Sequence, residues 1–220
     1  MKLVYKSLYL LTVIALFSHC KKEGNNDQVV IKGRITDALT GDAANDVSIK
    51  LFIKGIVDGV FNNNFQLIAE DQSDVNGNYQ IQFSKGTPTT YRFQVSGDGY
   101  YNLQQDENPD DFSVNNENEF DLEINSRAWL KVRVVDEGTV NNGDMVTFGL
   151  STENNACENC CSSSIIEISG SVDDTQVCEL FGGSYAYVNG VAVDANFGPM
   201  DIHDSVLIQP FDTTMMTISF

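Results

Sequence analysis

Apolar and polar residues alternate along most of the chain with a period of two, the pattern of strands that bury one face. No segment of useful length has the helical period. The sequence therefore predicts an all-β fold of two antiparallel β-sandwich domains in tandem. The predicted strands are residues 31–35, 47–53, 65–71, 79–83, 90–95 and 120–124, then 130–134, 146–150, 165–169, 177–181, 185–193, 205–208 and 214–220.

Turn residues separate these runs and fix where the chain reverses. Asn76-Gly77 tolerates positive φ, so it predicts a turn that leads into the half-buried strand beginning near Tyr79. The Gly- and Asn-rich residues 55–64 are interpreted as a loop insertion between strands, and the polar residues 102–119 as a surface excursion.

Three motifs together resemble the carboxypeptidase regulatory-like domain, a transthyretin-like sandwich with a carbohydrate-binding-like fold. They are Ile31-Lys32-Gly33-Arg34-Ile35-Thr36-Asp37 followed by Thr40-Gly41, then Ser73-Asp74-Val75-Asn76-Gly77-Asn78-Tyr79, and finally Gly97-Asp98-Gly99-Tyr100. The resemblance covers about a third of the chain. It implies a non-catalytic accessory domain in which Tyr100 packs under the end of a sheet.

The first 19 residues are interpreted as a signal peptide. The apolar run of ten residues, 8–17, is too short to span a bilayer, which needs about 20 helical residues. Phe17-Ser18-His19-Cys20 resembles the lipobox of bacterial, Bacteroidetes-type lipoproteins, which implies lipidation of Cys20, palmitate included. Phe17 and His19 depart from the usual box, so plain secretion without an anchor is the alternative.

The predicted organisation has four parts: signal peptide 1–19, lipidated tether 20–28, the regulatory-like sandwich 29–125 and a second sandwich 126–220. Attachment to a membrane through the lipid would place the protein in the cell envelope. We expect an outer membrane lipoprotein, on either the surface or the periplasmic face. The formal net charge of −18 repels phosphate backbones, so nucleic acid is excluded as a partner.

Four cysteines remain after Cys20, and an even number in an exported protein favours disulfides. They are Cys157, Cys160, Cys161 and Cys178. Adjacent cysteines pair poorly, which leaves Cys157–Cys160 with Cys161–Cys178, or Cys157–Cys161 with Cys160–Cys178. The two-residue spacing of Cys157 and Cys160 also matches a zinc ligand pair, although no second such pair follows.

The sequence predicts neither an enzyme nor a cofactor or metal site. His203, Asp204 and Ser205 are adjacent, which cannot place a base and a nucleophile as a triad requires, and they are interpreted as a polar loop. Asp74 and Asn76 resemble half of a calcium loop, but Gln72 stands where the first acid should be, so a hairpin turn is the favoured interpretation. A hydrolase that uses carboxylates of residues 102–119 is a further alternative.

Binding is the predicted function. The resemblance implies carbohydrate as the favoured ligand, because similar sandwich folds include starch-binding-like modules in which aromatic rings stack on sugar faces and amides bind hydroxyl groups. The candidate rings in this chain are Phe61, Phe65, Tyr101 and Trp129. The alternative is a structural or adhesive spacer that presents or contacts a partner protein of the envelope.

Overall fold

The architecture is that of a computed structural model, which describes residues 27–57, 59–138, 141, 143–153, 165–169 and 173–220. Within these residues the chain is nearly all β-strand, with one short 3₁₀ helix, which confirms the predicted all-β sandwich fold. In the same residues, no helix combines the length and the apolar character that crossing a membrane requires. We call the two halves of the fold the first and the second sandwich.

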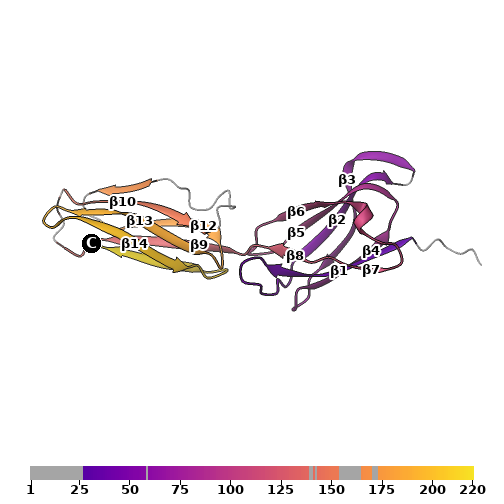
Figure 1. Cartoon of the computed structure of the whole chain (residues 1–220), viewed down its shortest axis with the longest axis horizontal. Coiled ribbons are helices and arrows are strands. Elements are labelled where there is room, and N and C mark those ends of the chain that lie inside the picture. The colour runs from indigo at the N-terminus through magenta and orange to yellow at the C-terminus, as the bar shows by residue number, and fades with distance from the viewer. Residues whose placement is uncertain (1–26, 58, 139–140, 142, 154–164, 170–172) are drawn as a thin grey trace, which may run out of the picture.

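The first sandwich pairs two four-stranded sheets (Figure 1). One sheet has the order β4-β1-β7, with β8 also paired to β1, and the other has the order β3-β2-β5-β6. The elements are β1 (Gln28–Asp37), β2 (Ser48–Val57), β3 (Val60–Gln72), β4 (Asn78–Ser84), β5 (Thr87–Ser96), β6 (Leu103–Glu107), the 3₁₀ helix η1 (Pro109–Asp111), β7 (Glu117–Glu119) and β8 (Leu122–Ile124).

The second sandwich pairs a four-stranded sheet, β11-β10-β13-β14, with a three-stranded sheet, β12-β9-β15. Its core includes Leu130, Phe148 and Val188, all almost inaccessible to solvent. The strands are β9 (Arg127–Val135), β10 (Met145–Thr152), β11 (Ile165–Ser169), β12 (Asp173–Phe181), β13 (Tyr185–Asp194), β14 (Gly198–Leu207) and β15 (Thr213–Ser219).

Most strand pairs are antiparallel, as predicted, but three are parallel: β1 with β7, β1 with β8, and β9 with β15. The chain reverses direction after β6 and crosses to the other sheet, so β7 and β8 run in the same direction as β1. Alternation gives no strand direction, so the sequence pattern did not reveal these parallel pairs.

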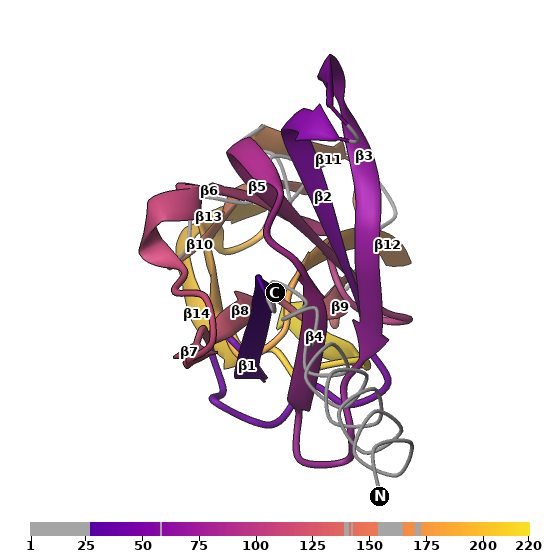
Figure 2. The same cartoon turned by 90° about the vertical axis from the view of Figure 1, so that its right-hand side faces the viewer.

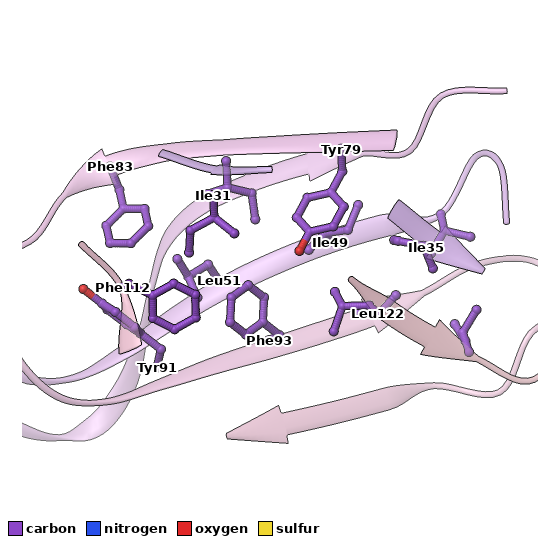
Figure 3. Close-up of a cluster of buried hydrophobic side chains, with 14 of the residues drawn as sticks. Ile31, Ile35, Ile49, Leu51, Tyr79, Phe83, Tyr91, Phe93, Phe112 and Leu122 are labelled. Carbon is purple, nitrogen blue, oxygen red and sulfur yellow. The ribbon is translucent and has the colours of Figure 1, made fainter. Parts of the chain in front are cut away.

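The core of the first sandwich follows the predicted alternation closely. Ile31 and Ile35 point inward from β1, Ile49 and Leu51 from β2, and Phe93 from β5, each fully buried. Figure 3 shows these side chains meeting between the two sheets together with Tyr79, Phe83, Tyr91, Phe112 and Leu122.

Gly33 permits a close crossing of the chain over β1. A Cβ at Gly33 would stand 1.8 Å from the Phe120 carbonyl oxygen, which is an impossible contact. The same oxygen accepts a hydrogen bond from the Tyr79 hydroxyl at 2.6 Å. Two residues of separate motifs, Gly33 and Tyr79, therefore hold the segment between β7 and β8 against the sheet.

Three loop interpretations are wrong. Residues 55–64, interpreted as a loop, contain the ends of a hairpin in which β2 and β3 pair as far as Val57 and Val60. Residues 102–119 contain β6, η1 and β7. His203 lies inside β14, because the pairing of β13 with β14 continues through Asn189 and His203 instead of ending before Ser205.

The two sandwiches lie end to end (Figures 1 and 2). The last residue of β1, Asp37, lies at the junction, because its carboxylate accepts the Ser126 amide hydrogen just before β9 begins. Gln28 lies at the far end of β1, and Val135, at the far end of β9, pairs with Ser219 near the chain's end. At about 3.3 Å per residue, β1 and β9 together give a molecule roughly 60 Å long.

Candidate functional site

Only two residues, Asn125 and Ser126, separate β8 from β9, so the sandwiches meet directly. The Arg127 amide donates to the Gly99 carbonyl at 2.7 Å, and its Nε donates to the Tyr100 carbonyl at 3.0 Å. The Arg127 carbonyl in turn accepts the Phe211 amide hydrogen at 2.8 Å. One residue therefore ties a loop of the first sandwich to a loop of the second.

Aromatic side chains fill this junction. Tyr101 packs edge-on against Phe181 with ring centroids 4.9 Å apart, and the Arg127 guanidinium lies 5.1 Å from the Tyr101 ring centroid. Burial, together with the nearby Glu179 carboxylate, raises the pKa of Tyr101 to about 12. Tyr101, predicted as a sugar-stacking ring, is thus part of the contact between the sandwiches.

Tyr100 is buried at the same junction, as the motif resemblance implies, with its ring centroid 5.1 Å from that of Phe211. Beside it a cavity of about 360 Å³ is lined by Asp42, Asp46 and Asp98 among others. Burial and the Asp37 and Asp42 carboxylates raise the pKa of Tyr100. Among the described residues, no three acidic, histidine or cysteine side chains converge closely enough to hold a metal ion.

The outer face of the β3-β2-β5-β6 sheet carries an aromatic platform, formed by Phe52, Phe65 and Leu67. Phe52 pairs across the sheet with Leu67 on β3 and with Arg92 on β5, so all three side chains share this face. The Arg92 guanidinium lies 3.7 Å from the Phe65 ring centroid. It is held there by two hydrogen bonds to the Asp106 carboxylate, at 2.6 and 2.7 Å.

This face continues into a cavity of about 330 Å³ further along the same strands. Lys50, Gln94 and Gln104 are among its lining residues, and the Gln94 amide donates to Gln104 at 3.3 Å. The hydrogen bonds from Arg92 lower the pKa of Asp106, which keeps that carboxylate charged beside the aromatic platform. The face therefore combines rings, amides and an ion pair on a rigid sheet.

The opposite sheet carries a shallow groove of about 700 Å³. Its charged groups are paired locally: Lys32 Nζ lies 2.5 Å from Glu117 Oε1, and Arg34 Nε donates to the Asn76 carbonyl. The Asp74 carboxylate accepts the Asn76 and Asn78 amide hydrogens, which lowers its pKa. Asp74 thus stabilises the hairpin turn, and the groove, among the described residues, lacks an exposed aromatic ring.

The four predicted binding rings do not form one site. Phe65 belongs to the aromatic platform, Tyr101 to the junction, and Phe61 to the exposed end of the β2–β3 hairpin. Trp129 lies half-exposed on β9 of the second sandwich. Arg92 and Asp106 were not predicted as site residues. The position of Arg92 on the polar side of an alternating strand could have indicated it.

The predicted cysteine pairs fall largely outside the described residues, as do Cys20 and the whole lipobox. Cys157, Cys160 and Cys161 lie there too, whereas Cys178 lies on β12 and packs, half-buried, against the second core. The disulfide pairing stays a prediction.

Comparison with protein families finds no family model that matches the chain. No curated protein matches its sequence either. The resemblance to the carboxypeptidase regulatory-like domain therefore stays a prediction drawn from its motifs.

Several solved structures resemble parts or most of the fold. The TIE protein of Bacillus anthracis aligns with 88% of the chain at 8% identity and a TM-score of 0.40, and the chain spans 33% of that protein's length. GBS52, the minor pilin of Streptococcus agalactiae, aligns at 13% identity and a TM-score of 0.32, over 87% of this chain and 94% of its own. A DUF3823 family protein from Bacteroides uniformis aligns at 13% identity and a TM-score of 0.29, over 82% and 99%. At these identities and scores the structures assign no family and no function to the chain.

Proposed function

We propose that the protein is a non-enzymatic accessory module of the bacterial envelope that works as a rigid, adhesive or spacing arm. The junction between the sandwiches carries this proposal. Arg127, Tyr101 and Asp37 link the two halves through hydrogen bonds and ring contacts across a connection of only two residues. A flexible linker would need more chain and fewer contacts.

In this proposal the arm is attached near residue 20, through a lipid on Cys20, and presents the far end of the second sandwich. Such an arm holds its contact surface about 60 Å from the point where the chain enters β1. The surface and periplasmic faces of the outer membrane are both compatible with this geometry.

Photo-crosslinking in cells tests the arm. A photoreactive amino acid at Phe197, which is 83% exposed at the far end of the second sandwich, is expected to capture one specific envelope or cell-surface protein. The matched position is Val75, 78% exposed in the β3–β4 turn of the first sandwich, which is expected to capture none. Capture of nothing specific at Phe197 would count against the arm.

Carbohydrate binding is a second candidate, favoured by the aromatic platform. Phe65 and Phe52 offer apolar surface for a sugar ring, while the Arg92–Asp106 pair and the Gln94 and Gln104 amides offer hydrogen-bond partners. A glycan array probed with the mature chain, residues 21–220, tests it. Binding that Phe65→Ala abolishes and Phe197→Ala preserves supports the idea, whereas silence across plant, host and microbial glycans refutes it.

A further inference from the structure

The β2–β3 hairpin ends in an apolar tip, which we define as Ile56, Val60 and Phe61. Val60 is 69% exposed, Phe61 59% and Ile56 40%. Ile56 and Phe61 are paired across the hairpin, so the two side chains lie together on one face. Large apolar side chains that are gathered and left in water usually mark a contact surface.

This tip lies at the end of the molecule where the chain enters. Gln28, the first residue of β1, pairs with Ser84 at the end of β4, and Thr87, which begins β5, pairs with Ile56. The short β4–β5 connection therefore joins the two sheets at one end, opposite the junction. Figure 1 shows the hairpin and the start of β1 at this same end of the molecule, and Figure 2 views that end directly.

The length of chain before β1 limits how far this end can lie from an anchor at Cys20. Seven residues lie between Cys20 and Gln28, and the eight steps of a chain fully extended at about 3.4 Å per residue would reach roughly 27 Å. That is less than the length of the first sandwich. A lipid on Cys20 would therefore keep the hairpin end within about 27 Å of the membrane.

We propose that the tip enters the interfacial layer of the lipid bilayer and seats the first sandwich on the membrane. This inference rests on the envelope placement and the anchor at Cys20 proposed above. Removal of Ile56, Val60 and Phe61 from water supplies the driving force.

The charge of the chain selects the kind of lipid. Between Ile56 and Ala69 the sequence carries a single charge, that of Asp58. The net charge of −18 opposes anionic lipid, so the tip is expected to enter a zwitterionic surface to a shallow depth. The same charge opposes a second copy of the chain as the partner of the tip.

Tryptophan fluorescence can report the depth of the tip, because Trp129 is the single tryptophan of the chain. The double variant Phe61→Trp, Trp129→Phe places the only tryptophan at the tip. The mature chain carries an N-terminal hexahistidine and is attached to phosphatidylcholine vesicles through a nickel-chelating lipid. Brominated acyl chains in the vesicles are expected to quench the tip tryptophan and to leave Trp129 of the parent chain unquenched.

The matched control is Phe197→Trp, Trp129→Phe, which places the tryptophan at an even more exposed apolar residue of the opposite end. It is expected to escape quenching. The inference is overturned if the tip tryptophan is not quenched, or if both ends are quenched equally, since the latter indicates non-specific adsorption. Because the nickel lipid supplies the attachment, either result is independent of whether Cys20 is acylated in cells.

A second measurement does not require tryptophan at the tip. Binding of the untagged mature chain to the same vesicles is expected to fall about tenfold when Val60 and Phe61 are both replaced by serine, because less apolar surface leaves water. Phe197→Ser is expected to leave binding unchanged. Equal binding by the parent chain and the Val60→Ser, Phe61→Ser variant contradicts the inference.

Discussion

Asp37 offers the sharpest test of how the two sandwiches are joined. The residue is 4% exposed, and its carboxylate accepts three backbone hydrogen bonds. Oδ1 accepts the Leu39 and Thr40 amide hydrogens, both at 3.0 Å, and Oδ2 accepts that of Ser126 at 2.9 Å. The first two bonds shape a turn of the first sandwich, whereas the third reaches the connection to the second.

The variant Asp37→Asn isolates the third bond. Its amide oxygen can still accept the two turn hydrogens, but its NH₂ group would face the Ser126 N–H, so two donors would meet in a buried place. A hydrogen bond to a charged group contributes about 1.5–3 kcal/mol, and we expect Asp37→Asn to lower the free energy of unfolding by that amount. Asp37→Ala removes all three bonds and should cost at least about 3 kcal/mol.

Urea unfolding followed by two probes measures this. Trp129 fluorescence reports on the second sandwich, and far-ultraviolet circular dichroism reports on both. Asp42→Asn is the matched control. Asp42 is exposed beside the same junction, and the substitution removes the same charge as Asp37→Asn does. If Asp37→Asn and Asp42→Asn differ by less than about 0.5 kcal/mol, the carboxylate does not hold the junction as argued.

Three further predictions concern single positions. Gly33→Ala should unfold at lower urea than Gly149→Ala, because a Cβ meets the Phe120 carbonyl at the first position and nothing within 4 Å at the second; equal midpoints would refute this. The Asp74 pKa is lowered on folding, so its stabilisation is present above the pKa of the unfolded chain, about 3.9, and is lost as the pH falls through the lower folded pKa. Acid titration of stability should therefore be less steep in Asp74→Asn, and an unchanged slope would contradict the argument. A disulfide at Cys178 can be tested by thiol titration of the denatured, unreduced chain that lacks Cys20. The parent chain is expected to have no free thiol and Cys178→Ser to have one, whereas four free thiols in the parent chain would exclude disulfides.

Local sequence patterns predicted the parts of the fold that depend on one strand at a time. The buried residues of β1, β2 and β5 are the apolar ones of each alternating run, because a strand in a sandwich buries every second side chain. Asn76-Gly77 turns as predicted, with Gly77 at a φ of +79°.

The predictions that were wrong concern segments whose structure depends on partners distant in sequence. Residues 55–64 contain three asparagines and two glycines, which are typical of loops, but pairing with β5 extends β2 through them and overrides that local preference. Gly59, at a φ of +79°, belongs to the short connection between the two strands. Alternation could not reveal this, because the apolar tip has no buried face.

The candidate site was predicted only in part for the same reason. Phe65 was recognised as a surface ring, yet its partner Arg92 lies 27 residues later and meets it only because β2 lies between their strands. Tyr101 appeared equally exposed in the sequence, but Phe181 covers it from 80 residues away. Residue type identifies candidate rings, whereas the fold decides which of them remain accessible.

The long first strand has a mechanical consequence for an anchored arm. β1 is hydrogen-bonded to β4 along seven residue pairs and to β7 and β8 along three each, and its ends lie at opposite ends of the first sandwich. A pull between the anchor and the far end of the second sandwich acts along this strand. These hydrogen bonds are therefore sheared together instead of being broken one by one. Force on a captured target would then be borne by the first sandwich as a whole.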